Sequence, residues 1–146
     1  MPKMRLKNMS KKKVWLDTNI VLRFLLKDHP DFFKAALNLF TEAENGRITL
    51  HLHPLTLAEV VWTLQGYYGH SKGEIAKTLS GMIEADGLFV EDKDVVKKAL
   101  YDYSEKNVDY IDAYLAALAL IKGPATIYTL DRKHFSRLEG DIKLLP

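Results

Sequence analysis

The stretch VWLDTNIVLRFLL, residues 14–26, joins a short apolar strand to a helix through an aspartate and a turn. Apolar and β-branched residues lead up to Asp17 and predict a strand. The apolar residues that begin at Ile20 recur with a helical period. Sites in open α/β sheets lie beyond the carboxyl ends of the parallel strands. We therefore expect Asp17 to lie at the site edge of an α/β fold.

The rest of the chain continues this alternation of strands and helices. Helical periodicity is interrupted at Pro30, which suits the start of a second helix, and Asn45-Gly46 suits its end. Thr56 is a candidate N-cap for the next helix. Further short apolar strands are predicted at 47–53, 88–91, 125–131 and 142–145, with helices between them. The pattern predicts a three-layer α/β/α domain with a short, mainly parallel central sheet.

Composition narrows the class of protein. A chain of 146 residues with 47% hydrophobic and 27% charged residues fits one globular domain. It has no Cys, which excludes disulfide scaffolds, zinc–thiolate sites and cysteine nucleophiles. No run of 18 apolar residues and no secretory signal occurs, so a cytoplasmic protein is expected.

Positive charge is concentrated in the first 13 residues, MPKMRLKNMSKKK. They hold six of the 21 basic residues and no acid, so the rest of the chain has a net charge of −4. Residues 1–13 are predicted to be a basic, flexible leader that precedes a domain at 14–146. Contact of this leader with phosphates is the alternative.

Four acids with apolar neighbours are candidate site residues. Asp17 and Asp131 end predicted strands, and Glu59 and Asp112 lie near the starts of predicted helices. Each alone could be an ordinary cap, turn or first-turn acid. Together they predict a shared cleft, where the repulsion between carboxylates would be relieved by a divalent cation. A set of oxygen ligands favours Mg²⁺ or Mn²⁺.

The segments VWLDTNIVLRFLL, TLAEVVWTL, DYIDAYLAALAL and IYTLDRKHF resemble the PIN domain in order and spacing. The short length resembles the VapC-type toxins of type II toxin–antitoxin systems. The resemblance covers residues 14–146. It implies a PIN-like fold and a Mg²⁺- or Mn²⁺-dependent endoribonuclease, in which the metal activates the water that hydrolyses an RNA phosphodiester.

The resemblance also implies roles for individual residues. Asp17, Glu59 and Asp112 would be the core catalytic and metal-binding acids, and Asp131 the fourth. Thr18, Asn19 and Thr129 fall on supporting positions of the family motifs. Leu130 stands where many relatives carry a basic residue, so Arg132 is the candidate for a contact with an RNA phosphate. Asp109 has two interpretations: the N-cap of its helix, or a further acid of the metal site.

The same resemblance implies partners: an RNA substrate, a cognate antitoxin protein and a second copy in a homodimer. Two other functions remain open. A phospho-acceptor signalling domain also places acids at strand ends with Mg²⁺, although the paired acid and the Lys expected there are missing. A non-catalytic module that binds RNA or a protein partner is the other.

Several remaining residues have a structural interpretation that we favour. His51 and His53 alternate on a predicted strand without a third ligand nearby. Aromatic residues such as Trp62 are expected in the core or in a dimer contact. The helix at 107–121 is so apolar that most of its surface should be buried. Lys72, Lys77, Lys133 and Arg137 are expected on solvated faces, with binding of phosphates as the alternative.

Overall fold

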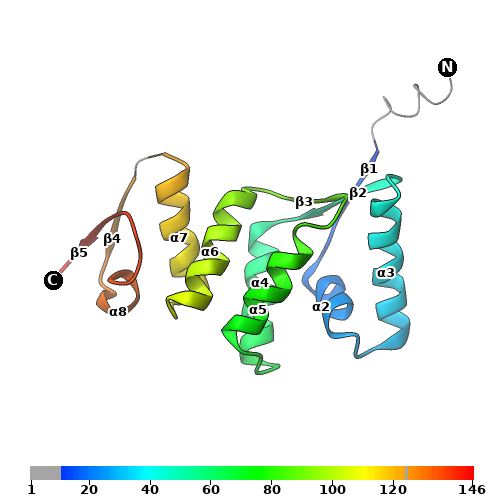
Figure 1. Ribbon diagram of the computed structural model, residues 1–146, viewed down its shortest axis with the longest axis horizontal. Coiled ribbons are helices and arrows are strands. Elements are labelled where there is room, and N and C mark those ends of the chain that lie inside the picture. The colour runs from blue at the N-terminus through cyan, green and yellow to red at the C-terminus, as the bar shows by residue number, and fades with distance from the viewer. Residues whose placement is uncertain (1–10, 124) are drawn as a thin grey trace, which may run out of the picture.

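The computed structural model describes residues 11–123 and 125–146. It shows an α/β protein with short parallel strands (Figure 1). Residues 1–10, most of the predicted leader, lie outside the described residues. The first strand includes Lys12 and Lys13, which the sequence analysis assigned to the leader. None of the helices in the described residues is long and apolar enough to cross a membrane.

The described elements alternate nearly as the sequence predicts. The strands are β1 (Lys12–Trp15), β2 (Ile48–Leu52), β3 (Leu88–Val90), β4 (Thr126–Thr129) and β5 (Asp141–Leu144). The helices are α2 (Thr18–Leu26), α3 (Pro30–Glu44), α4 (Pro54–Gly66), α5 (Lys72–Met82), α6 (Lys93–Glu105), α7 (Tyr110–Ile121) and α8 (Arg132–Phe135).

Local sequence signals explain most helix ends. Pro30 begins α3, and the ring of His29 accepts a hydrogen bond from a first-turn amide. After α3 the chain turns at Gly46, whose φ of 76° favours glycine. The prediction of Thr56 as an N-cap was wrong. Helix α4 begins at Pro54, and His53 caps it by accepting the amide hydrogen of Leu55.

All strand pairs are parallel, as predicted, but they form two groups. Strands β1, β2 and β3 form one sheet in that order, and β4 pairs with β5. Helix α7 packs chiefly on α6, and β4 follows α7 directly. Figure 1 accordingly shows β4, β5 and α8 beyond α6 and α7, on the side away from α3. The described strands therefore do not form one continuous sheet.

The core lies between the three-stranded sheet and its helices. Leu50 and Leu52 of β2 are fully buried, as are Leu57 and Val61 of α4. They belong to a hydrophobic cluster that also includes apolar residues of α5, α6 and α7. This continuous core fixes the helices that carry the candidate acids.

Helix α7 is less buried than its composition predicts. One face, which includes Tyr110, Ala113 and Ala117, is buried. The opposite face exposes Ile111 and Leu115 by 46% and 44%. The expectation of a helix buried on most of its surface was therefore wrong, because α6 covers only one side of α7 and β4 leaves part of the other side open.

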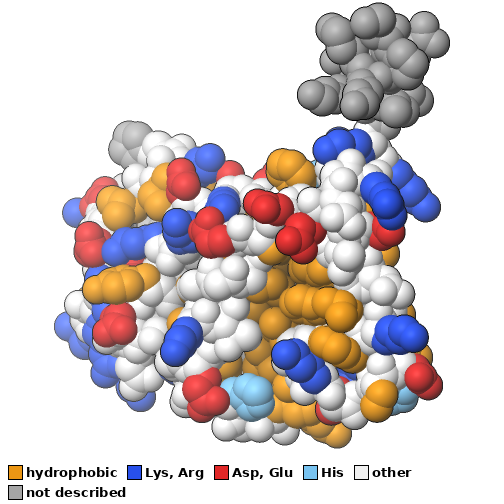
Figure 2. All heavy atoms as spheres, turned by 45° about the vertical axis from the view of Figure 1, so that its right-hand side comes forward, with side chains coloured by type: hydrophobic (Ala, Val, Ile, Leu, Met, Phe, Trp, Pro, Cys, Tyr) orange, Lys and Arg blue, Asp and Glu red, His pale blue; other side chains and the backbone are white. Residues whose placement is uncertain are grey.

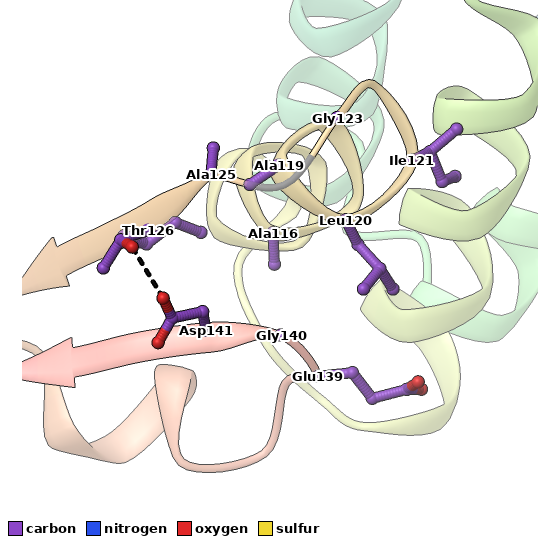
Figure 3. Close-up of a pocket in the computed structure, with 11 residues that line it drawn as sticks. Ala116, Ala119, Leu120, Ile121, Gly123, Ala125, Thr126, Glu139, Gly140 and Asp141 are labelled. Atoms are coloured by element: carbon purple, nitrogen blue, oxygen red, sulfur yellow. Dashed lines mark hydrogen bonds between the residues drawn. The ribbon is translucent and has the colours of Figure 1, made fainter.

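A hollow of about 540 Å³ lies between the second half of α7 and the β4–β5 pair (Figure 3). Ala116 and Leu120 line it from the helix, and Thr126 and Asp141 from the strands. The hydroxyl of Thr126 donates a hydrogen bond of 2.6 Å to Asp141. None of the candidate site residues lines this hollow, so the site must be sought elsewhere.

Candidate metal centre

Asp112, in the first turn of α7, lies beside the imidazole of His134 on α8. The Nδ1 atom of His134 is 3.1 Å from a carboxylate oxygen of Asp112 and 3.4 Å from one of Asp131. The side chains of Asp112 and His134 are about one-fifth exposed. Two of the four predicted acids therefore meet at one partly buried point, although they lie on different helices.

Two hydrogen bonds fix Asp131 at the start of α8. Its carboxylate accepts the amide hydrogen of His134 at 3.0 Å, which makes Asp131 the N-cap of this short helix. Its own amide donates to the hydroxyl oxygen of Thr129 at 3.0 Å. Thr129, a predicted supporting residue, thus contacts the backbone of the acid that it was predicted to support.

Asp109 occupies the N-cap position of α7, but its side chain makes no capping hydrogen bond. Its carboxylate is 63% exposed and lies 3.8 Å from Nδ1 of His134. Its position in the chain agrees with the N-cap interpretation. Its side chain lies toward His134, which favours the interpretation as a further acid of the metal site. Asp109 is therefore a candidate acid of the metal site.

Buried tyrosines support the segment that carries these acids. The rings of Tyr103 on α6 and Tyr110 on α7 meet edge to face, with centroids 5.9 Å apart. Burial, aided by the negative charge of Asp109, raises the pKa of Tyr103 to about 12. Burial also raises the pKa of Tyr110. Both hydroxyls are therefore protonated at neutral pH, and they add no charge beside the acids.

Asp109, Asp112 and His134 form a donor set that suits a divalent cation. Each offers one ligand atom, and these atoms lie within 4.8 Å of one another. Carboxylate oxygens with one imidazole nitrogen fit Mn²⁺ well and remain compatible with Mg²⁺. Among residues 11–123 and 125–146, no other group of three or more His, Cys, Asp or Glu side chains meets this distance.

Asp17 and Glu59 lie outside this group. Asp17 caps α2 by accepting the amide hydrogen of Ile20 at 2.9 Å, and with Asn19 it lines a hollow of about 280 Å³ against α3. Thr18 is the first residue of α2. Glu59 is exposed on α4, and in the described part of the chain no ion pair engages it. Their place in the metal site stays a prediction.

The sequence analysis missed His134 as a candidate site residue. It weighed His51 and His53 instead. His51 contacts Thr49 at 2.9 Å, and His53 caps α4. His134 stands three residues after Asp131, a spacing that places both on one side of a helical turn. That spacing was the available signal.

The surroundings of the site include Arg132, which is exposed at the start of α8. No carboxylate in the described residues pairs with it. The predicted contact of Arg132 with a phosphate therefore has an accessible donor, although nothing in the geometry tests it.

Comparison with known proteins gives one family match. A model of the PIN domain matches residues 14–141, which is most of the chain. No curated protein matches. A solved structure that is similar to this chain is described as VapBC2 from Rickettsia felis bound to a DNA fragment from their promoter. The similarity has a TM-score of 0.39 and 18% identity, and it covers 92% of this chain and 99% of that chain.

Proposed function

Because this chain belongs to the PIN domain family, whose members are generally nucleases, we propose that it is a metal-dependent endoribonuclease. The observation that carries this proposal is the convergence of Asp112 and Asp131 on His134, at 3.1 and 3.4 Å from one ring nitrogen. Three carboxylates gathered around one imidazole repel anions unless a cation is present. Mn²⁺ or Mg²⁺ fits the donors.

In the proposed site Asp112, Asp131, Asp109 and His134 would hold the cation. When bound, a divalent cation makes water a stronger nucleophile and neutralises charge that develops on a phosphate. Asp131 is held in position by Thr129 and by the amide of His134. Asp112 is held by α7, whose opposite face packs in the core. The acids are thus fixed before a ligand arrives, which lowers the cost of binding.

The proposed reaction is hydrolysis of a phosphodiester in RNA. Water adds to the phosphorus, the bond to the leaving 3′-oxygen breaks, and that oxygen takes a proton. The products are a 5′-phosphate and a 3′-hydroxyl. Asp17 and Glu59 complete the proposed acid set through their positions in the family-like motifs, with Thr18 and Asn19 in support of Asp17. Arg132 is proposed to contact a substrate phosphate.

We further propose that the nuclease is the toxin of a toxin–antitoxin pair that acts in the cytoplasm. Its motifs and its length of 146 residues resemble VapC-type toxins. An antitoxin and a second copy are the proposed protein partners. Figure 2 shows a hollow lined with hydrophobic side chains on one face of the molecule. Exposed residues such as Phe32 of α3 and Trp62 of α4 supply apolar surface for such contacts.

Cleavage of a labelled single-stranded RNA by the purified protein tests the nuclease. Cleavage is expected with Mn²⁺ or Mg²⁺ and is expected to stop in EDTA. Asp112→Asn should lower the rate by about a hundredfold or more, because it removes a charged ligand. Asp31→Asn is the matched control, since Asp31 is exposed in the first turn of α3. An Asp112→Asn variant with full activity would disprove the site.

Expression in a bacterial host tests the toxin separately. Growth should stop on induction of the active protein and continue with the Asp112→Asn variant. Normal growth in the presence of confirmed nuclease activity would disprove the toxin and leave the nuclease standing. RNA binding without cleavage in Mn²⁺ would favour the non-catalytic alternative.

A further inference from the structure

Two cations from different elements bind the turn that leads into α7. The ammonium of Lys72, at the start of α5, donates to the carbonyl oxygen of Val108 at 2.9 Å. The guanidinium of Arg137, just after α8, donates to the carbonyl oxygen of Asn107 at 2.8 Å. Asp109 follows this turn directly. Two positive side chains are therefore held next to the candidate metal centre.

Lys133 adds a third positive charge at the same place. It precedes His134 on α8 and is exposed. Burial lowers the pKa of Lys72. The charge of Asp109 opposes this effect, and the charges of Arg137 and Lys133 add to it. Arg137 and Lys133 thus both act on Lys72, and we call the three side chains the cationic cluster.

No ion pair in the described chain neutralises the cationic cluster, although the negative charge of Asp109 acts on Lys72. Within the part of the chain that the structure describes, no acid lies within 4.0 Å of Lys72, Lys133 or Arg137. In contrast, Lys98 on α6 and Lys106 just after it both pair with Glu139, at 2.8 and 3.1 Å. Lys98 and Lys106 are thus ion-paired, whereas the cationic cluster makes no ion pair with the described residues.

The cationic cluster also keeps unused hydrogen-bond donors. A lysine has three N–H donors and an arginine has five. Lys72 uses one for the carbonyl of Val108, and Arg137 uses its Nη1 for carbonyls of the same turn. Arg137 and Lys133 are exposed, and Lys72 is partly exposed. All three side chains therefore keep donors for an anion with several acceptor oxygens.

We propose that Lys72, Lys133 and Arg137 together bind a backbone phosphate of single-stranded RNA, next to the phosphodiester that lies at Asp112 and Asp131. This inference rests on the proposed function, which supplies RNA as the ligand. The acids alone repel RNA, and a neighbouring positive surface attracts it and orients its backbone. The cationic cluster therefore decides where the strand lies relative to the acids.

The test is the salt dependence of RNA binding, measured by fluorescence anisotropy. The probe is a labelled single-stranded RNA of mixed sequence, titrated in EDTA at a series of KCl concentrations. Each phosphate contact that is lost reduces the slope of log K against log salt by about 0.7. Because the three side chains share the phosphate, Lys133→Gln and Arg137→Gln should each reduce the slope by up to this amount and weaken binding by about fivefold.

Two control variants separate charge from folding. Arg137→Lys keeps the charge and should keep the slope. Lys77→Gln removes an exposed charge from the same helix as Lys72, where Lys77 lines a different hollow with Gly73 and Tyr101. It should leave the slope unchanged. Thermal unfolding of each variant confirms that it is folded. Lys133→Gln is the most informative, since the Lys133 side chain makes no hydrogen bond or ion pair with the described residues.

The outcomes distinguish this inference from the proposed function. Unchanged slopes in both Gln variants, or an equal loss in Lys77→Gln, would overturn the phosphate site even if the protein cleaves RNA. Slopes that are reduced in Lys133→Gln and Arg137→Gln but not in the controls support the site. They do so even if cleavage in Mn²⁺ is not observed, because the binding assay contains no metal.

Discussion

The imidazole Nδ1 of His134 lies 3.1 Å from a carboxylate oxygen of Asp112, and this contact joins α8 to the first turn of α7. The two residues are 22 positions apart, so the contact depends on the tertiary fold. It brings the acids of two separate motifs to one point. His134 is therefore both a link between the motifs and a nitrogen donor beside them.

His134→Ala should weaken the binding of Mn²⁺ by about ten- to a hundredfold, because it removes one donor and the contacts that hold Asp112 and Asp131 near it. The loss should be larger for Mn²⁺ than for Mg²⁺, since an imidazole nitrogen suits Mg²⁺ poorly. Free Mn²⁺ measured by electron paramagnetic resonance during a titration gives the affinity directly. Competition by Mg²⁺ in the same titration gives the ratio.

His70→Ala is the control for this experiment. The side chain of His70 makes no hydrogen bond or ion pair with other described residues. Its removal should leave both affinities unchanged. Equal affinities for Mn²⁺ in His134→Ala and in the unmutated protein would exclude His134 from the donor set.

Asp17 offers a test that separates a cap from a catalytic acid. Its carboxylate accepts the amide hydrogen of Ile20 at the start of α2. Asparagine caps helices about as well as aspartate, whereas alanine costs about 1 kcal/mol. Asp17→Asn should therefore keep the free energy of unfolding and lose metal-dependent RNA cleavage. Asp17→Ala should lose RNA cleavage and also lower the free energy of unfolding by about 1 kcal/mol. Urea unfolding and the cleavage assay measure the two effects.

Full cleavage by Asp17→Asn would show that Asp17 is a cap only. The pair of variants is its own control, because both remove the same charge and only one removes the capping acceptor. A lower stability of Asp17→Asn than of Asp17→Ala would contradict the capping role instead.

The sequence predicted the elements well because their signals are local. Pro30 and Gly46 bound α3 through backbone preferences that need no neighbour. Asp131 lies two residues beyond the end of β4, where it caps α8, and not at the strand end that was predicted. The α/β class follows from the alternation of these elements, and it is confirmed. The residues just beyond the ends of strands were therefore accessible to reasoning from sequence.

Relations between distant segments were not accessible in the same way. The separation of β4 and β5 from the three-stranded sheet depends on how α7 packs on α6. The exposed face of α7 follows from that packing and not from its composition. His134 was missed for the same reason, since its contact with Asp112 is visible only when α8 lies against α7. Periodicity shows which residues share an element, but not which elements meet.

Gly87 marks a close approach of two elements and gives a prediction on stability. Its φ is +80°, and a Cβ atom there would lie 2.8 Å from the Cβ of Ala43 on α3, with backbone atoms of Ala43 nearer still. Gly87→Ala should lower the free energy of unfolding by more than about 2 kcal/mol, through backbone strain and this clash. Urea unfolding measures the change.

Gly81→Ala is the matched control, because Gly81 lies in α5 with open space around its Cα. Alanine there should raise stability by up to about 1 kcal/mol, as expected for a helix. Equal effects of the two substitutions would show that α3 does not approach Gly87 as closely as described.

The ion pairs of Glu139 predict how stability depends on pH. Lys98 and Lys106 donate to its carboxylate and lower the pKa of Glu139 from its ordinary 4.5 to about 2. A depressed pKa means that the folded state favours the charged carboxylate. The stabilisation is thus complete above pH 4.5 and is lost as the pH falls from 4.5 to about 2. Glu139→Gln should melt at a lower temperature than the unmutated protein at pH 7, and this difference should disappear across that range. The effect should shrink in high salt, because the carboxylate is exposed.

Glu44→Gln is the control for this prediction. Glu44 is an exposed acid at the end of α3 and makes no ion pair with the described residues, so Glu44→Gln should show no such pH-dependent difference. A difference for Glu139→Gln that persists at pH 2 would show that contacts other than these ion pairs stabilise the fold at this position.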